Sequence, residues 1–555
     1  MNVGTGGDAL VAGLKAHDIH TVFGLPGAQI YGLFDAFHRG GMRVVGARHE
    51  QACGYMAFGS ARATGRSAAF AVVPGPGVLN AGAAALTAFG CNEPVLCLTG
   101  QVPLTFLDAG LGHLHEMPNQ LATLRGFYKR AERVEHPSVA AHVLADVMRT
   151  MNSGRKGPGV LEMPWEVFSL RAELGQAARL DVPPPPAATP DDVSKAAALI
   201  ADSRAPMIFV GSGATHAHDA VRRLAERIQA PVVAFRSGRG IVSNAHALGL
   251  TVAEAYELWS QTDLAIGIGT RMEVPRWRWP YQPLNQKTIR IDIDPAEMRR
   301  GRPDVGLVAD AAVATELLLT EVERVDKRRR DRWSDIQSVR EKVAMQVAEI
   351  QPQVDYLKAM RDVLPPETIV TDELSQVGFT SWYAFPVYAP RTFLSSGYQG
   401  NLGSGYPTAL GAKVAMPDRP VVAICGDGGF LFGVQELATA AQYGIAVVAL
   451  VFNNRSYANV RRDQLTRFGG RVIGANLQNP DFLKVADAFG VQAARVSTPD
   501  QLRKTLERAV AANAPWLIEV DTPIDSETDP WRFLHPSRPP GVTGNPTLSG
   551  VFTRQ

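Results

Sequence analysis

The chain has 555 residues, of which 46% are hydrophobic and 20% are charged, as is usual for soluble globular proteins. At roughly 150 residues per domain, this length predicts three or four domains, each with a full hydrophobic core. The composition excludes a disordered, collagen-like or disulfide-stapled protein. The 56 basic and 54 acidic residues give a net charge of +2, which argues against a general nucleic-acid binder.

The cysteine pattern and the N-terminus favour a soluble cytoplasmic protein over a secreted or membrane protein. The four cysteines, Cys53, Cys91, Cys97 and Cys425, form no C-x-x-C pair, so we expect reduced core thiols and no zinc site. The N-terminus lacks the cationic start and apolar stretch of a signal peptide, and no apolar run approaches the ~20 residues that span a bilayer. We therefore expect a cytoplasmic protein that binds neither membrane nor nucleic acid.

Two breaks divide the chain into pieces of comparable size. Four consecutive prolines, Pro183 to Pro186, indicate a stiff spacer without helix or sheet. A second break lies near residues 321–332, where the basic run 327–330 interrupts a mixed helical pattern. We expect an N-terminal domain at 1–180, a central domain at 190–325 and a C-terminal domain at 350–555.

Short apolar runs alternate with helical patterns in all three pieces. This alternation predicts the α/β class, with three domains that each contain a mostly parallel sheet flanked by helices. Ligands of such sheets bind at the carboxyl ends of the strands, so the turns after the strands should carry the functional residues. The runs that predict strands lie at 21–23, 69–73, 94–98, 207–210, 231–235, 264–268, 288–293, 368–370, 421–425 and 446–452.

One glycine-rich turn resembles the start of a dinucleotide fingerprint. Gly211 and Gly213 follow the predicted strand 207–210. However, His216 stands at the third glycine position, and the next strand ends at Phe235 rather than at an acid, as the fingerprint would require. We interpret this segment as a tight turn and not as a nicotinamide site.

A second glycine turn, Gly-Asp-Gly-Gly at 426–429, carries more information. It ends the predicted strand 421–425 and precedes a helical stretch at 433–443. Glycines at such a junction let backbone N–H groups approach a diphosphate. The side chain of Asp427 would add a hard oxygen ligand for Mg²⁺.

The next predicted strand supplies a partner for this acid. Strand 446–452 ends in Asn453 and Asn454. Parallel strands that end side by side would bring Asp427 and Asn454 together, although 27 positions separate them in the chain (454 − 427 = 27). The sequence therefore predicts a magnesium and diphosphate site at this edge of the sheet.

With these motifs in place, the chain resembles the thiamine diphosphate (ThDP)-dependent 2-oxoacid decarboxylases and carboligases, in particular the acetolactate synthase catalytic (large) subunits. The resemblance covers nearly the whole chain. It implies a ThDP-binding fold in which pyrimidine-binding and diphosphate-binding domains enclose a Rossmann-like central domain. Its markers lie at 22–27, 48–52, 75–77, 98–103, 267–271, 291–295, 400–403 and 435–439.

The resemblance also implies roles for residues around the cofactor. Glu50 would hydrogen-bond the pyrimidine N1′ and favour the tautomer that acts as a base, and Leu402 would hold the two rings in a bent shape. The carbonyl of Gly400 would accept a hydrogen bond from the 4′-amino group, and that of Ser456 would be a third ligand to Mg²⁺. The implied cofactor-binding residues are Gly400, Leu402, Gly426, Asp427, Gly428, Gly429, Asn454 and Ser456, and the implied metal ligands are Asp427, Asn454 and Ser456.

Three further residues join Glu50 as catalytic candidates. Gln101 resembles the family's polar contact to the reacting intermediate. His113 and His115 could serve proton transfer or substrate binding beside Glu116, or they could be ordinary loop residues. The catalytic set that we expect is Glu50, Gln101, His113 and His115.

Departures from the family pattern leave the substrate open. Asp463 stands where acetolactate synthases carry a tryptophan, and Val460 stands where pyruvate decarboxylases carry a glutamate. Arg461 and Arg462 could bind a carboxylate or phosphate of the substrate, or be solvated charges. We expect decarboxylation of pyruvate or a related 2-oxoacid with carboligation to a second carbonyl. The alternatives are a decarboxylase or carbon–carbon lyase for another 2-oxoacid, a flavin-containing 2-oxoacid oxidase and, more distantly, a scaffold without activity.

The resemblance extends to partners and to a second cofactor. It implies a homodimer or homotetramer with active sites at the subunit interface and a small-molecule 2-oxoacid as substrate. The central domain keeps Gly-Thr-Arg at 269–271 and Asp-Ile-Asp-Pro at 292–295, positions near flavin adenine dinucleotide (FAD) in acetolactate synthases. It has Thr-Val-Ala at 251–253 in place of Met-His-Gly. FAD therefore fits the pattern in part, but we do not expect it.

Overall fold

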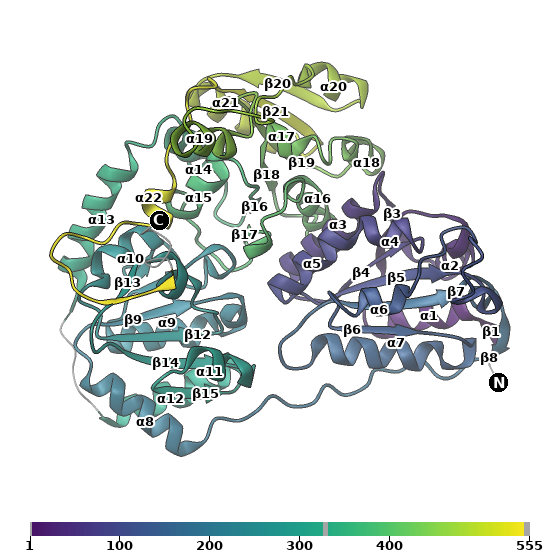
Figure 1. Ribbon diagram of the computed structural model, residues 1–555, viewed down its shortest axis with the longest axis horizontal. Coiled ribbons are helices and arrows are strands. Elements are labelled where there is room, and N and C mark those ends of the chain that lie inside the picture. Colours follow the sequence, from purple (N-terminus) through teal and green to yellow (C-terminus); the bar gives the residue numbers. More distant parts are fainter. Residues whose placement is uncertain (1–2, 326–330, 549–555) are drawn as a thin grey trace.

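Three parallel sheets organise the computed structural model, which describes residues 3–325 and 331–548 (Figure 1). Each of these sheets has six strands within the described ranges, and all six come from one of the three predicted stretches of chain. Helices pack on both faces of the sheets, so the predicted α/β class with three mostly parallel sheets is confirmed. The domain boundaries themselves stay a prediction, and the basic run at 327–330 lies outside the described residues.

The first sheet has the strand order β3-β2-β4-β5-β7-β6. Side chains that alternate along its strands enter two apolar cores, one shared with α1, α2 and α7 and the other shared with α3 and α5, as expected for a parallel sheet that is covered on both faces. The elements are β1 (Val3–Thr5), α1 (Gly6–Ala16), β2 (Thr21–Gly24), α2 (Tyr31–Arg39), β3 (Arg43–Gly46), α3 (Glu50–Thr64), β4 (Ala68–Val72), α4 (Pro76–Asn80), α5 (Gly82–Cys91), β5 (Val95–Gln101), α6 (Gln120–Leu124), β6 (Arg130–Arg133), α7 (Pro137–Asn152), β7 (Gly159–Pro164) and β8 (Arg171–Glu173).

The central sheet has the order β11-β10-β9-β12-β14-β15. Counted along the chain, this is the 3-2-1-4-5-6 order of dinucleotide-binding folds, so the Rossmann-like prediction is confirmed. Residues 174–189 form neither helix nor strand and run along the edge of the molecule from the first sheet to this one (Figure 1). The elements are α8 (Pro190–Asp202), β9 (Pro206–Val210), α9 (His218–Ile228), β10 (Val232–Ala234), β11 (Gly249–Leu250), α10 (Val252–Trp259), β12 (Leu264–Ile268), β13 (Tyr281–Gln282), β14 (Lys287–Asp292), α11 (Pro295–Gly301), β15 (Val305–Val308), α12 (Ala311–Val325) and α13 (Trp333–Val347).

The third sheet, β17-β16-β18-β19-β21-β20, repeats the strand order of the first. The helix expected at 433–443 begins at Glu436, three residues later than predicted, and a separate short helix that was not predicted begins at Asp427. The elements are α14 (Gln353–Val363), β16 (Ile369–Thr371), α15 (Gln376–Ala384), β17 (Phe393–Leu394), α16 (Gly405–Ala415), β18 (Val421–Gly426), α17 (Asp427–Phe430), α18 (Glu436–Tyr443), β19 (Val447–Asn453), α19 (Ala458–Arg467), α20 (Phe482–Ala488), β20 (Gln492–Val496), α21 (Pro499–Ala511), β21 (Trp516–Asp521), α22 (Trp531–Leu534) and β22 (Asn545–Pro546).

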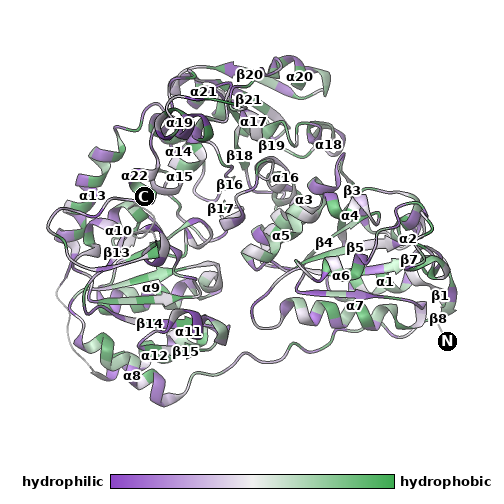
Figure 2. Ribbon diagram, viewed as in Figure 1, coloured by the Kyte–Doolittle hydropathy of each residue, from purple (hydrophilic) through white to green (hydrophobic). Residues whose placement is uncertain are grey.

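Helices α3 and α16 join the first and third sheets through a close contact. A Cβ atom on Gly59 of α3 would overlap the backbone of Thr408, and one on Gly411 of α16 would overlap the backbone of Met56. These two glycines therefore let the helix backbones touch, and one apolar core continues from the first sheet into the third. Figure 2 shows that the central strands are mainly hydrophobic, whereas the helices carry both hydrophobic and hydrophilic residues.

Within residues 3–325 and 331–548, no helix combines the length and the apolar character that crossing a membrane would need.

Candidate functional site

The glycine turn and the asparagine pair lie at the ends of two neighbouring strands, at the same edge of the third sheet. Gly426, at the end of β18, pairs with Phe452 of β19. The register therefore places Asp427 and Asn454 just beyond two adjacent strand ends. Both residues line one cavity of about 340 Å³, where the sequence predicted a site.

Asp427 is buried, and an amide from a distant segment holds it in place. The side-chain amide of Asn479 donates to Asp427 Oδ2 at 2.7 Å and to Asn453 Oδ1 at 2.9 Å, so it ties the two strand ends together. Burial raises the pKa of Asp427, because desolvation disfavours the charged carboxylate. A cation at this place would offset that cost. The spacing in the chain gave no signal for Asn479, because its contact depends on the fold.

The two neighbouring asparagines have different surroundings. Asn453 donates to Glu519 Oε1 at 2.8 Å, and its Oδ1 accepts from Asn479, so its amide is engaged inside the protein. Asn454 lines the cavity, and its Oδ1 accepts from the Ser456 hydroxyl at 3.2 Å. Asn454 is therefore the member of the pair whose oxygen can reach a ligand.

Close neighbours explain why two positions of the turn are glycine. A Cβ on Gly428 would overlap the ring of Tyr457, and a Cβ on Gly429 would overlap the carboxyl group of Glu373. Glu373 lines the cavity and was not predicted from the sequence. Of the predicted cofactor residues, Leu402, Gly426, Asp427, Gly428, Gly429, Asn454 and Ser456 line this cavity, and Gly400 lies two residues outside it along the chain.

The donor set of this cavity suits Mg²⁺ together with a diphosphate. Asp427 offers a carboxylate, Asn454 an amide oxygen and Ser456 a backbone carbonyl. Among the described residues, no group of three or more His, Cys, Asp or Glu side chains could hold a metal ion by itself. Magnesium is commonly bound by one or two carboxylates completed by phosphate oxygens and water, so this sparse set fits the predicted pair of ligands.

Glu50 lies at the carboxyl edge of the first sheet. It is the first residue of α3, half-buried, and its Oε2 accepts from the side-chain amide of Asn80 at 3.1 Å. The ring of His49 caps the helix by accepting from the Gln51 N–H at 3.1 Å. The cap fixes the first turn of α3 and hence the position of Glu50.

The other catalytic candidates gather at the same edge. Gln101 ends β5, and its Oε1 accepts from the N–H of Val102 at 2.8 Å. His115 Nδ1 lies 2.7 Å from Gln29 Oε1, and the ring of His113 packs at 5.0 Å from that of Phe106. Both imidazoles are thus held in defined positions.

A proline–glycine turn at 75–77 connects His115 to Glu50. A Cβ on Gly75 would lie 2.6 Å from the carbonyl of His115, and a Cβ on Gly77 would lie 3.5 Å from Glu50 Oε1. The structure therefore brings these two predicted residues to opposite ends of one short turn.

Only one half of the predicted site lines the Asp427 cavity. Among the described residues, those that line the Asp427 cavity come from positions 352–526, and none comes from the first sheet. Glu50, Gln101, His113 and His115 lie at the edge of that first sheet instead.

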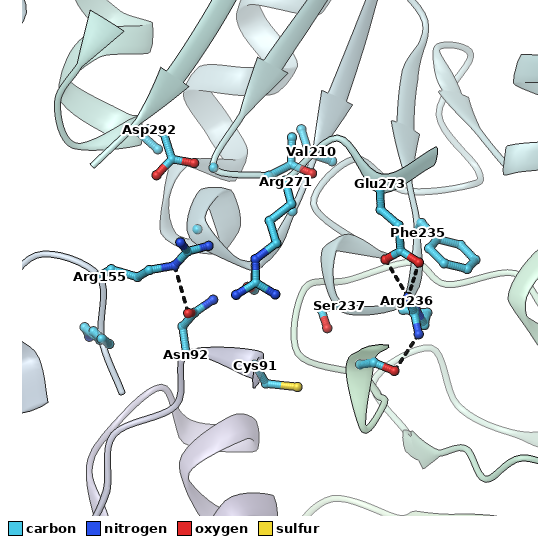
Figure 3. Close-up of a pocket in the computed structure, with 18 of the residues that line it drawn as sticks. Cys91, Asn92, Arg155, Val210, Phe235, Arg236, Ser237, Arg271, Glu273 and Asp292 are labelled. Carbon is cyan, nitrogen blue, oxygen red and sulfur yellow. Dashed lines mark hydrogen bonds and ion pairs between the residues drawn. The ribbon is translucent and has the colours of Figure 1, made fainter. Parts of the chain in front are cut away.

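A second cavity, of about 270 Å³, lies at the carboxyl ends of β9 and β12 in the central sheet (Figure 3). Arg155, which donates to Asn92 at 3.0 Å, borders it from the N-terminal domain. Arg236 borders another side and pairs with Glu273. Arg271 extends between these groups in Figure 3. The strand order reverses between β9 and β12, and such switch points bind nucleotides in open α/β sheets.

Arg461 and Arg462 are engaged in ion pairs. Arg461 pairs with Glu527, and Arg462 pairs with Asp529 at 2.5 Å and with Asp463 at 2.9 Å. These contacts fasten α19 to the segment before α22. Both arginines therefore have carboxylate partners within the chain, and the two alternatives considered for them stay predictions.

Comparison with known proteins agrees with this architecture. The chain matches three family descriptions: "Thiamine pyrophosphate enzyme, N-terminal TPP binding domain" over residues 4–123, "central domain" over 193–318 and "C-terminal TPP binding domain" over 374–520. Thiamine pyrophosphate is another name for ThDP. The three matches lie on the three sheets in chain order.

Several curated proteins are similar over almost the whole chain. A probable acetolactate synthase large subunit of Methanocaldococcus jannaschii is 31% identical, over 97% of this chain and 94% of its own length. The acetolactate synthase isozyme 1 large subunit of Escherichia coli is 28% identical, over 97% and 96%. A probable 2-ketoarginine decarboxylase, AruI, of Pseudomonas aeruginosa is 31% identical, over 93% and 94%.

The three-sheet fold and these matches define a class of enzymes that use ThDP. The chain belongs to the thiamine pyrophosphate enzyme family. The family that the sequence motifs predicted is therefore confirmed.

Proposed function

We propose that the protein decarboxylates a 2-oxoacid, pyruvate or a relative, with ThDP and Mg²⁺, and joins the product to a second carbonyl, as acetolactate synthases do. The observation that carries this proposal is the cavity at the edge of the third sheet. There Asp427, Asn454 and Ser456 present oxygen donors beside a glycine turn, and Leu402 lines the same space. Relatives named acetolactate synthase over more than nine-tenths of the chain support it.

The residues of the chain have distinct tasks in this proposal. When bound, ThDP supplies the carbon nucleophile and the electron sink that decarboxylation requires. Asp427 and Asn454 hold the metal and so fix the diphosphate. Leu402 orients the two rings, and Glu50 holds a proton in a hydrogen bond to the pyrimidine N1′. The remaining assignments are the Gly400 and Ser456 carbonyls as acceptor and third metal ligand, and Gln101, His113 and His115 as groups that bind substrate or transfer protons.

We further propose that two chains complete each active site, in a homodimer or homotetramer. The described lining of the Asp427 cavity includes neither Glu50 nor another residue of the first sheet, which supports this. Large apolar side chains are exposed near both halves: Leu111 and Leu114 beside His113, and Phe468 and Ile473 after α19. Such surfaces commonly mark protein contacts.

A second candidate function is decarboxylation of a different 2-oxoacid without carboligation. Asp463 on α19 stands where acetolactate synthases carry a tryptophan. In addition, the relative AruI is named as a probable 2-ketoarginine decarboxylase. A cationic substrate would need unpaired acids near the cavity. However, Asp463, Glu527 and Asp529 each face an arginine, which favours a 2-oxoacid without a cationic side chain, such as pyruvate.

A flavin-containing oxidase is a lesser alternative. The cavity at the switch point of the central sheet has the position of a nucleotide site, but Thr251 is engaged in capping α10, where its hydroxyl accepts from the Glu254 N–H. We do not expect FAD. The absorption spectrum of the purified protein tests this, because a bound flavin would colour it yellow.

The test of the main proposal is direct. Calorimetry should show ThDP binding that depends on Mg²⁺. A panel of 2-oxoacids should then identify the donor through CO₂ release, and NMR of the products should separate an aldehyde from a carboligation product. Absence of Mg²⁺-dependent ThDP binding would refute the proposal, and an aldehyde as sole product would favour the second candidate.

A further inference from the structure

Glu373 is a buried carboxyl group for which the proposed function has no role. It directly follows β16, is 2% exposed and lines the Asp427 cavity. Its Oε1 accepts from the backbone N–H of Gly403 at 2.5 Å, whereas its Oε2 is buried without a hydrogen-bond partner. In the described ranges, no lysine or arginine forms an ion pair with it.

This side chain touches two segments that are distant in sequence. Gly403 directly follows Leu402. On the other side, the carboxyl group packs against Gly429 so closely that a Cβ there would overlap it. The N–H groups of Gly403, Gly426 and Gly405 favour the charged form, but burial outweighs them and raises the pKa of Glu373 to about 7. An unpaired buried carboxyl group is costly, and such costs are commonly retained at functional sites.

We propose that Glu373 is a positioning residue that locks the segment carrying Leu402 onto the glycine turn carrying Asp427. The inference rests on the proposed function, in which Leu402 orients the rings of the cofactor and Asp427 fixes its diphosphate. In that proposal, the relative position of these two residues would determine how the rings lie relative to the diphosphate. Glu373 keeps that relative position constant, because it binds the backbone on one side and packs under the turn on the other.

The neighbouring residue Asp372 provides a matched control. It is also a buried carboxyl group, 3% exposed, and burial raises its pKa to about 6. Its Oδ2 accepts from the indole N–H of Trp382, and Arg236 and Arg239 act on it from the central domain. Asp372 thus matches Glu373 in burial and chemistry, but its hydrogen bond goes to α15 rather than to the Leu402 segment.

The first test needs no cofactor. Amide hydrogen exchange of residues 400–406 should be at least about tenfold faster in Glu373→Ala than in the parent protein, because the Gly403 N–H loses its acceptor. Asp372→Asn should leave exchange of this segment unchanged. Equal exchange in Glu373→Ala and the parent would overturn the inference.

The second test uses the protein with ThDP and Mg²⁺. Misplacement of reacting groups by about 1 Å can cost about 10²-fold in rate, so kcat of Glu373→Ala should fall by about that factor while ThDP affinity stays within about tenfold. Glu373→Gln should recover most of the rate, because its amide oxygen can accept from Gly403. Near-UV circular dichroism of the bound cofactor should change in Glu373→Ala and not in Asp372→Asn.

The outcomes separate the inference from the proposed function. If the parent protein fails to bind ThDP, the proposed function is wrong, and the exchange experiment still tests the lock. If the parent is active but Asp372→Asn loses as much kcat as Glu373→Ala, Glu373 is only a structural acid. If Glu373→Ala does not fold, Glu373→Asp replaces it: its shorter chain should not reach Gly403, and a parent-like kcat would contradict the lock.

Discussion

The first and third sheets have the same strand order, yet the turns at their carboxyl edges carry different chemistry. After β4 the chain continues as Pro-Gly-Pro-Gly at 74–77, and after β18, which holds the equivalent place, as Gly-Asp-Gly-Gly at 426–429. β5 ends at Gln101, whereas the equivalent β19 ends at Asn453 and is followed by Asn454. The shared topology supplies positions at an edge, and the residues in the turns decide which part of a ligand each edge can hold.

The largest effect should come from the turn at 426–429, where we propose that the metal binds. Asp427→Ala should weaken Mg²⁺-dependent ThDP binding in calorimetry by more than about 100-fold, since even groups outside the ligand shell cost 10–100-fold. Asp463→Ala is the control, because this acid faces Arg462. Unchanged affinity in Asp427→Ala would mean that the third sheet does not bind the diphosphate through this residue.

The equivalent edge of the first sheet should affect turnover rather than binding. Glu50→Gln is nearly isosteric, so ThDP affinity should stay within about tenfold, while kcat should fall by about 10²–10⁴-fold through loss of acid–base assistance. Exchange of the C2 proton of bound ThDP in D₂O, followed by quenched-flow NMR, reports this step directly. A Glu50→Gln protein that exchanges the proton as fast as the parent would remove Glu50 from the catalytic set.

Mixing these two inactive variants tests whether the two edges act across a subunit interface. In a mixed dimer of Asp427→Ala and Glu50→Gln chains, one site would carry both substitutions and the other would carry neither. Random pairing should restore about one quarter of parental activity, because half of the dimers are mixed and each has one intact site. Coexpression with two affinity tags would isolate the mixed dimers. No recovery in them would place Glu50 and Asp427 in the same chain's site.

A smaller difference concerns stability. β2 is followed by Leu-Pro-Gly at 25–27, whereas its equivalent β16 is followed by the buried acids Asp372 and Glu373. Burial raises the pKa of Asp372 from 3.8 to about 6, so the folded state binds more protons than the unfolded state between these values, and stability falls as pH rises through that range. The free energy of unfolding should fall by about 3 kcal/mol at most over this pH range.

Denaturant unfolding at several pH values checks this expectation. The free energy of unfolding of the parent, minus that of Asp372→Asn, should decrease between pH 4 and pH 6.5 and then become constant, because asparagine does not titrate. A difference that is independent of pH would show that Asp372 has an ordinary pKa.

The sequence predicted most of the central strands, although it missed β7 and β21, which lie inside their sheets. β18 and β19 are continuous apolar runs, which a strand buried on both faces requires. The edge strands β6 (Arg-Ala-Glu-Arg) and β20 (Gln-Ala-Ala-Arg-Val) are polar or mixed, so they gave no apolar signal. The first turn of α17 was missed because two glycines follow Asp427, and glycine disfavours helix.

The same distinction applies to the candidate site. Asp427 and Asn454 could be paired from the sequence, because neighbouring parallel strands end at a common edge. Asn479 and Glu373 could not, since their contacts depend on how a loop before α20 and the end of β16 fold onto that edge. The ion pairs of Arg461 with Glu527 and of Arg462 with Asp529 likewise involve acids 66 and 67 positions away, which no local pattern indicates.

The glycine contact between α3 and α16 has a consequence for the proposed dimer. Helix α3 begins at Glu50, and α16 begins at Gly405, three residues after Leu402. If Glu50 serves one active site and Leu402 the other, these two packed helices connect both active sites through a single chain. A shift of the backbone at one active site would then move the backbone at the other, so substrate binding at the two sites would be thermodynamically coupled.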